Sequence, residues 1–168
     1  MKELQKLLRA LENDIFNLKL TQLPSHLPVA VLFKFLRNLT TLSITYGATH
    51  LGSKYERVAF GITILDATNI EDCIRISKTL VSLGLPGNMI DKDILQRMMK
   101  SLVLNTSITQ LDLSHNILGD IGARRISKYI KHSKILTHLN LCDNNVISQK
   151  LAKFCRSIMK DQDGLLKS

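Results

Sequence analysis

The sequence predicts a mixed α/β fold in which one strand–helix unit is repeated. Leu83, Leu111 and Leu139 recur at intervals of 28 residues. Each is the first Leu of a Leu-x-Leu segment, and an Asn follows three residues after the second Leu. Alternating apolar residues predict a strand, and the apolar residues that follow at helical spacing predict a helix. Because a helix then connects consecutive strands, the strands should be parallel, with the helices in a second layer.

Residues 1–38 are predicted to form a helical N-terminal cap. The segment from Lys2 to Leu20 has the pattern of an amphipathic helix, and Pro28 to Leu36 predicts a second, shorter one. Terminal units of repeat proteins are commonly atypical because one of their faces meets solvent. The cap is therefore expected to differ from the units that follow it.

Residues 39–80 are predicted to form degenerate units. The segment Leu39 to Ile44 resembles the end of one unit and the strand of the next, and Phe60 to Ile64 alternates like another strand. Asn69 to Leu80 predicts a helix with Asn69 as its N-cap, since an Asn side chain accepts hydrogen bonds from the first backbone N–H groups. This region lacks both the repeated Asn and the 28-residue spacing.

Residues 81–160 are predicted to hold regular 28-residue units, followed by a C-terminal tail over 161–168. Both Leu side chains of each strand should point to the same face and into the core. Each helix should bury one apolar stripe against its strand. The stripes consist of Leu95, Met98 and Leu102, then Ala123, Ile126 and Ile130, then Leu151, Phe154 and Ile158.

The Leu-x-Leu-x-x-Asn pattern followed by a helix is that of a leucine-rich repeat, in its longer, ribonuclease-inhibitor-like form. The predicted fold is therefore a leucine-rich-repeat solenoid, a horseshoe segment with parallel strands on the concave face and helices on the convex face. In that family the Asn turns inward and satisfies backbone groups left unpaired after the strand. The residues at this position are Asn88, Asn116 and Asn144.

Composition favours a folded intracellular protein. The chain has 168 residues, 45% of them apolar, which suits one domain with a core. Cys73, Cys142 and Cys155 form no CxxC pair and are odd in number, which argues against a disulfide framework or a zinc ribbon. The apolar stretch Leu27 to Phe33 is too short to cross a bilayer, and the first residues lack the apolar run of a signal peptide.

The residue types of a hydrolase triad occur together at Asp112, Ser114 and His115. A triad needs side chains that converge in space beside an oxyanion site, which residues this close on one strand and its turn do not provide. No phosphate-binding glycine motif and no His or Cys cluster at metal-ligand spacing is present. We therefore expect no catalytic residue, no cofactor and no metal.

Basic residues dominate the charge, with 23 Lys and Arg against 14 Asp and Glu, a net charge of +9. In the repeat register they form two columns on the predicted helices, which would bind an acidic surface. The alternative is a charged helix face that only keeps the protein soluble. Nucleic acid is disfavoured because stacking aromatics and binding motifs are missing. The first column is Arg97, Arg125 and Lys153, and the second is Lys100, Lys128 and Arg156.

The segment Leu36 to Val146 resembles the leucine-rich-repeat subunit of the nexin-dynein regulatory complex, the T-complex-associated testis-expressed protein family. Its most specific parts are LSITYG and LDLSHNILGDIGAR, although the second also occurs in ribonuclease-inhibitor-like and Ran-GTPase-activating proteins. Family members usually carry several more repeats. The resemblance implies a structural and regulatory role without catalysis, in the axoneme of cilia and flagella. The implied partners are other subunits of the complex, with acidic coiled coils or tubulin among the candidates. Binding to a membrane is not expected.

Two other functions fit a repeat protein. One is regulation of an enzyme, as a GTPase-activating or inhibitory repeat protein, and the other is a fragment of an innate-immune or ubiquitin-ligase adaptor. GTPase activation needs an outward-facing catalytic or positioning residue, and the sequence offers no distinctive candidate. No accompanying adaptor domain is visible.

Overall fold

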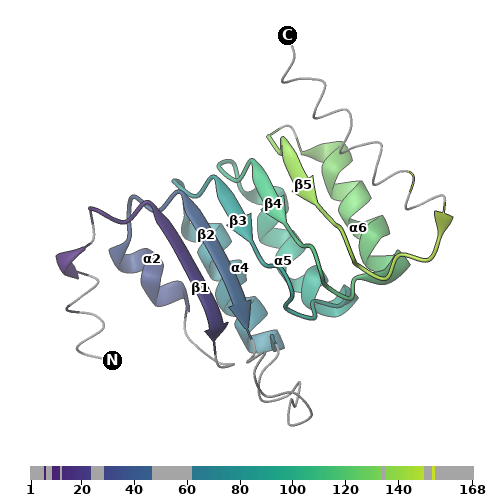
Figure 1. The fold of residues 1–168 in the computed structure, drawn as a ribbon. Helices are drawn as coiled ribbons and strands as arrows, with labels where there is room; N and C mark the ends of the chain where they lie inside the picture. The colour runs from purple at the N-terminus through teal and green to yellow at the C-terminus, as the bar shows by residue number, and fades with distance from the viewer. Residues whose placement is uncertain are drawn as a thin grey trace.

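The structure is a computed structural model that describes residues 6, 9–11, 13–23, 29–46, 62–133, 135–149 and 153. The described residues form a five-stranded parallel sheet in the order β1-β2-β3-β4-β5, and the helices lie together on one face of it (Figure 1). The strands are β1 (Asn17–Leu23), β2 (Thr41–Tyr46), β3 (Ser82–Gly84), β4 (Gln110–Asp112) and β5 (His138–Asn140). The helices whose bounds fall within the described residues are η1 (Val29–Val31), α2 (Leu32–Phe35), α4 (Ile64–Ile76), α5 (Lys92–Leu104) and α6 (Gly119–His132).

The repeat register is visible in the strand pairing. Leu83 lies opposite Leu111, and Leu111 lies opposite Leu139, so each strand is displaced from the next by one 28-residue unit. Helix α4 packs against α5, and α5 packs against α6, in the same order as the strands. The predicted mixed α/β fold with parallel strands is thereby confirmed.

The unit that begins with β2 is longer than the regular ones. Leu42 lies opposite Leu83, 41 residues farther along the chain. The N-caps of α4 and α5, Thr63 and Asp91, are nevertheless 28 residues apart. The additional residues therefore lie between β2 and α4, where residues 47–61 are outside the described part of the chain.

The predicted start of the first long helix was wrong. Helix α4 begins at Ile64, where Thr63 and Asp66 form a capping box, and it ends at Ile76. Asn69 therefore lies inside the helix, and Leu80 lies beyond it. The predicted strand over Phe60 to Ile64 is also wrong where it can be compared. Ile62 and Thr63 belong to no strand and Ile64 is helical, while residues 60 and 61 are not described.

The N-terminal segment contains a strand that the helical prediction missed. β1 covers Asn17–Leu23 and pairs in parallel with β2, so the predicted helix from Lys2 to Leu20 is wrong over its last four residues. Residues 13–16 are not helical either, whereas residues 6, 9 and 10 are helical as predicted. Leu18 and Leu20 pack against the core and alternate with exposed neighbours, which is the pattern of an edge strand. The short helix predicted within residues 28–36 is confirmed by η1 and α2.

The core lies between the sheet and the helices. Each long helix contributes apolar side chains at the same places of the 28-residue period, and α4 follows this period although the strand before it does not. The third predicted stripe, at residues 151, 154 and 158, is outside the described residues. The aligned buried residues are Ala67, Leu95 and Ala123 in one column and Ile70, Met98 and Ile126 in the next.

Gly122 lies in the first turn of α6, where the Leu118 side chain leaves no room for a Cβ atom. A Cβ at this position would lie 2.8 Å from the Cβ of Leu118. Gly122→Ala gains about 1 kcal/mol of helix propensity, but relieving such a contact costs about 1–3 kcal/mol. We expect a net loss of about 1 kcal/mol in the free energy of unfolding, measured by urea denaturation. Ser127→Ala, in the same helix, is the control and should not lower stability; a stabilising Gly122→Ala would contradict the prediction.

Candidate protein-interaction surface

The repeated asparagines lie buried at the turn after each of β3, β4 and β5. Asn116 accepts hydrogen bonds from the N–H groups of Asn88 and Ile90, both at 2.9 Å, and donates to the carbonyl of Leu85 at 2.9 Å. Asn88 likewise bonds to Ile44, and Asn144 to Leu113. Each Asn thus joins its own turn to the preceding unit and satisfies backbone groups buried there.

A second polar column, which the sequence analysis missed, follows the helices. The side chains of Ser77, Asn105 and Ser133 each accept a hydrogen bond from the backbone N–H three residues later, at 3.0, 2.8 and 3.2 Å. Asn105 also donates to the carbonyl of Ile74 at 2.8 Å. These residues recur every 28 positions, so the period itself was the signal that could have revealed them.

The Asp112, Ser114 and His115 side chains make contacts with different partners and not with one another. Asp112 Oδ1 accepts a hydrogen bond from the Ser114 N–H at 2.9 Å, and the Ser114 side chain is buried. His115 has a left-handed backbone and its Nδ1 lies 3.0 Å from Asp143 Oδ2 in the next unit. The second residue after each Leu-x-Leu segment is left-handed in all three regular units, with φ of 65° at Gly87, 55° at His115 and 53° at Asp143.

The face of the sheet that points away from the helices is polar and carries little charge. The outward side chains of β2, β3, β4 and β5 alternate with the buried leucines. Most are small hydroxyl or amide residues, so this face offers neither a cationic nor an apolar patch. The residues are Thr41, Ser43, Thr45, Ser82, Gly84, Gln110, Asp112, His138 and Asn140.

The predicted basic columns lie on the outer side of α5 and α6, and we call this the basic face. Arg97 and Lys100 are exposed on α5, and Lys128 is exposed on α6. Arg125 is half-buried and donates a hydrogen bond to the Lys92 carbonyl, so it ties α6 to the start of α5. Lys153 is exposed, whereas Arg156 is outside the described residues.

The basic face also includes Arg124, which is exposed on α6, and it does not extend to α4. In the 28-residue register, α4 has Asn69 where α5 has Arg97, and Asp72 where α5 has Lys100. Asp72 forms an ion pair of 2.7 Å with Arg75 on the same helix. Charge therefore changes along the row of helices, from acidic at α4, which has Asp66, Glu71 and Asp72 against Arg75, to basic at α6.

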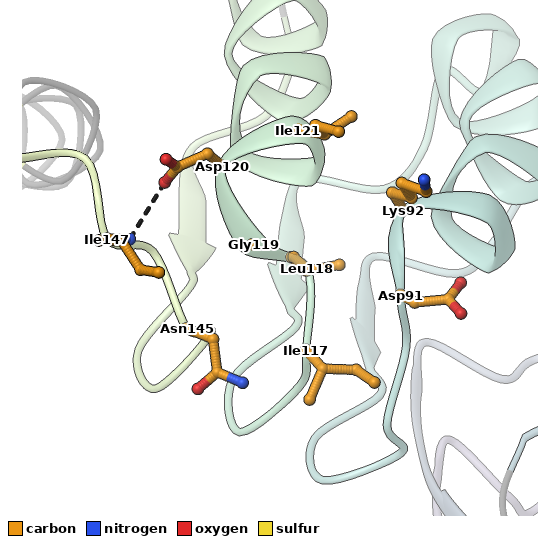
Figure 2. Close-up of a pocket in the computed structure, with 9 residues that line it drawn as sticks. All are labelled: Asp91, Lys92, Ile117, Leu118, Gly119, Asp120, Ile121, Asn145 and Ile147. Carbon is orange, nitrogen blue, oxygen red and sulfur yellow. Dashed lines mark hydrogen bonds between the residues drawn. The ribbon is translucent and has the colours of Figure 1, made fainter.

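A hollow of about 470 Å³ lies where α5 and α6 begin, beside the loop that follows β5 (Figure 2). Ile121 is 49% exposed and Ile147 is 87% exposed, so apolar surface reaches solvent at its rim. Its carboxylates already accept backbone hydrogen bonds: Asp91 caps α5, and Asp120 Oδ1 accepts from the N–H groups of Ile147 and Ser148, each at 3.1 Å. The lining residues are Asp91, Lys92, Ile117, Leu118, Gly119, Asp120, Ile121, Asn145 and Ile147.

Two titratable side chains, Tyr46 on β2 and Cys73 on α4, are buried between the sheet and the helices. Burial, with a smaller effect of the Asp72 charge, raises the pKa of the Cys73 thiol to about 12. Burial and the charge of Asp66 raise the pKa of the Tyr46 phenol far above its ordinary value of 10.0. The Tyr46 hydroxyl has no hydrogen-bond partner among the described residues. Both groups are therefore held in their neutral forms.

These groups predict loss of stability at alkaline pH. The unfolded chain releases the Cys73 proton near its ordinary pKa of 9.0, but the folded chain holds it to about 12, so the free energy of unfolding should fall over this interval. Tyr46→Phe should reduce that slope and should also raise stability at neutral pH by about 1 kcal/mol, because it removes an unpaired buried hydroxyl. Urea denaturation at pH 7, 9 and 10 measures both effects. A less stable Tyr46→Phe chain would contradict the second.

Within the described part of the chain, no group of three or more His, Cys, Asp or Glu side chains is placed to hold a metal ion. No helix in that part is both long and apolar enough to cross a membrane. Cys73 is buried and Cys142 is exposed, each as a free thiol, and Cys155 lies outside the described residues.

Solved structures define the class of fold. The Caenorhabditis elegans tropomodulin C-terminal domain matches with a TM-score of 0.64 at 12% identity, covering 99% of this chain and 95% of that one. The actin-binding site 2 structure of leiomodin-1 matches with a TM-score of 0.72 at 13% identity, covering 98% and 90%. The chain therefore shares the fold of these domains, and at such low identity the likeness shows the fold alone. No protein-family model matches the chain.

The chain is also similar in sequence to a named protein of several organisms. Dynein regulatory complex subunit 5 of mouse is 31% identical over 103 residues, covering 61% of this chain and 21% of the relative, and the human protein matches to the same extent. The Chlamydomonas reinhardtii protein is 29% identical over 94 residues, covering 55% and 24%. The predicted resemblance to a dynein regulatory complex subunit is confirmed. The chain spans about a fifth to a quarter of the length of these relatives.

Proposed function

We propose that this chain is a non-enzymatic, structural and regulatory part of the axonemal nexin-dynein regulatory complex and contributes to the control of ciliary and flagellar motility. The similarity to dynein regulatory complex subunit 5 from mouse, human and an alga carries this proposal. The chain would work in the cytoskeleton of the cilium through contacts with other subunits.

We also propose that its strand–helix units are leucine-rich repeats of a solenoid, with the sheet on the concave face and the helices on the convex face. The 28-residue strand register and the buried asparagines that join successive units support this reading. Repeat arrays of this type expose long surfaces of aligned side chains, which suits a subunit that holds other proteins together.

Immunoprecipitation of the tagged chain from isolated cilia, followed by mass spectrometry, tests the complex. Recovery of dynein regulatory complex subunits, and their loss when axonemes lack the complex, is the expected result. Recovery without any such subunit or any dynein component would overturn the proposal. A strong stimulation of GTP hydrolysis in a panel of small GTPases would instead favour an enzyme regulator.

A further inference from the structure

The basic face is a surface whose charge is not balanced within the described chain. Arg97 and Lys100 on α5 and Arg124 on α6 are exposed and form no ion pair there. Elsewhere opposite charges do meet, as Arg75 does with Asp72. A field of one sign attracts and orients a partner of the opposite sign.

The hollow adds an apolar component at the end of the same face. Ile121 lies one helical turn before Arg124 on α6, and Lys92 at the start of α5 lines the hollow. Because an α-helix rises about 1.5 Å per residue, the apolar rim and the cations are about 5–12 Å apart along the helices. That spacing matches side chains one to two turns apart on a partner helix.

We propose that the basic face binds an acidic amphipathic helix of a partner protein, with an apolar side chain in the hollow. Its carboxylates would lie against Arg97, Lys100 and Arg124. The inference rests on the proposed function, because it names the kind of partner that a protein-binding subunit would hold there.

Nucleic acid fits this surface less well than an acidic helix. The exposed side chains of Ile121 and Ile147 offer a phosphate backbone nothing to bind. The carboxylates of Asp91 and Asp120 line the hollow and would repel a continuous run of phosphates. An amphipathic helix avoids that repulsion by placing an apolar residue at this point and its acidic residues farther along.

The test measures binding of the whole chain to defined probes by fluorescence anisotropy. The main probe is a labelled peptide of about 20 residues, made of Leu, Glu and Ala, with Leu on one helical stripe and Glu beside it. A peptide of the same composition with the stripe scrambled, and a DNA duplex, are the comparison probes. We expect the striped peptide to bind more tightly than either one.

Variants of the chain separate the two components. Arg97→Glu, Lys100→Glu and Arg124→Glu together should weaken binding of the striped peptide at least about tenfold. A peptide with Lys in place of Glu should bind this variant better than the original chain. Ile121→Ser with Ile147→Ser should weaken the striped peptide about threefold to tenfold and leave DNA unaffected. Circular dichroism confirms that each variant is folded.

The matched control reverses three exposed charges at the opposite end of the sheet: Lys19→Glu, Lys34→Glu and Arg37→Glu. It makes the same change in net charge, so it should leave most of the binding intact. Equal losses in the two triple variants would overturn the proposal, as would equal binding of the striped and scrambled peptides or tighter binding of DNA. If the peptides fail while the chain still recovers regulatory-complex subunits from cilia, the docking surface is wrong and the proposed function stands.

Discussion

Asn116→Ala is expected to lower the free energy of unfolding by about 4 kcal/mol, because several buried backbone groups lose their partners together. Its side chain is 2% exposed. It accepts from two N–H groups, at Asn88 and Ile90, and donates to the carbonyls of Leu85, Leu113 and Ser114, all within 3.0 Å. Alanine can replace none of these bonds. Urea denaturation followed by circular dichroism measures the loss.

Two other asparagines provide the comparison. Asn140→Ala removes one exposed hydrogen bond, to the Cys142 N–H at 3.1 Å, and should cost less than about 1 kcal/mol. Asn144→Ala should have an intermediate effect, since Asn144 accepts from the Leu118 N–H at 3.4 Å. Similar losses in Asn116→Ala and Asn140→Ala would show that the buried bonds do not stabilise the units.

Leu113→Ala should lower the free energy of unfolding by about 3 kcal/mol, through lost burial and the cavity left behind. Leu113 is fully buried between the sheet and the helices, where the neighbouring units place Leu85 and Leu141. Leu104→Ala is the matched control, because Leu104 is 77% exposed at the end of α5, and it should change stability by less than about 0.5 kcal/mol. Equal effects of the two substitutions would contradict the assigned core.

The regular part of the fold was predictable because one period specifies both strand and helix. Knowing that Leu83, Leu111 and Leu139 share a position was enough to predict their pairing in neighbouring parallel strands. The same period places Thr63 in line with Asp91, and Thr63 with Asp66 is a recognisable capping sequence. The sequence therefore encodes the start of α4 locally, although the alternation over Phe60 to Ile64 just before it resembles a strand.

β1 was harder to predict, because its signal is weak and local. Leu18, Leu20 and Leu23 are compatible with a helix that continues the preceding amphipathic pattern, and only pairing with β2 selects the extended form. The columns of basic residues were visible in the sequence, but their surroundings were not. The bond from Arg125 to the Lys92 carbonyl and the hollow beside it depend on how two helices pack, which periodicity alone does not specify.

The asparagine ladder also determines how the chain would respond to mechanical force. The side chains of Asn88, Asn116 and Asn144 each bond to the unit before their own, so cohesion is shared between nearest neighbours. Tension that pulls the end strands apart along the row would load all of these junctions with the same force, so the weakest would open first. We expect such a chain to lengthen in steps of one unit under tension. When the tension is released, each unit should re-form its contacts with the neighbouring folded unit.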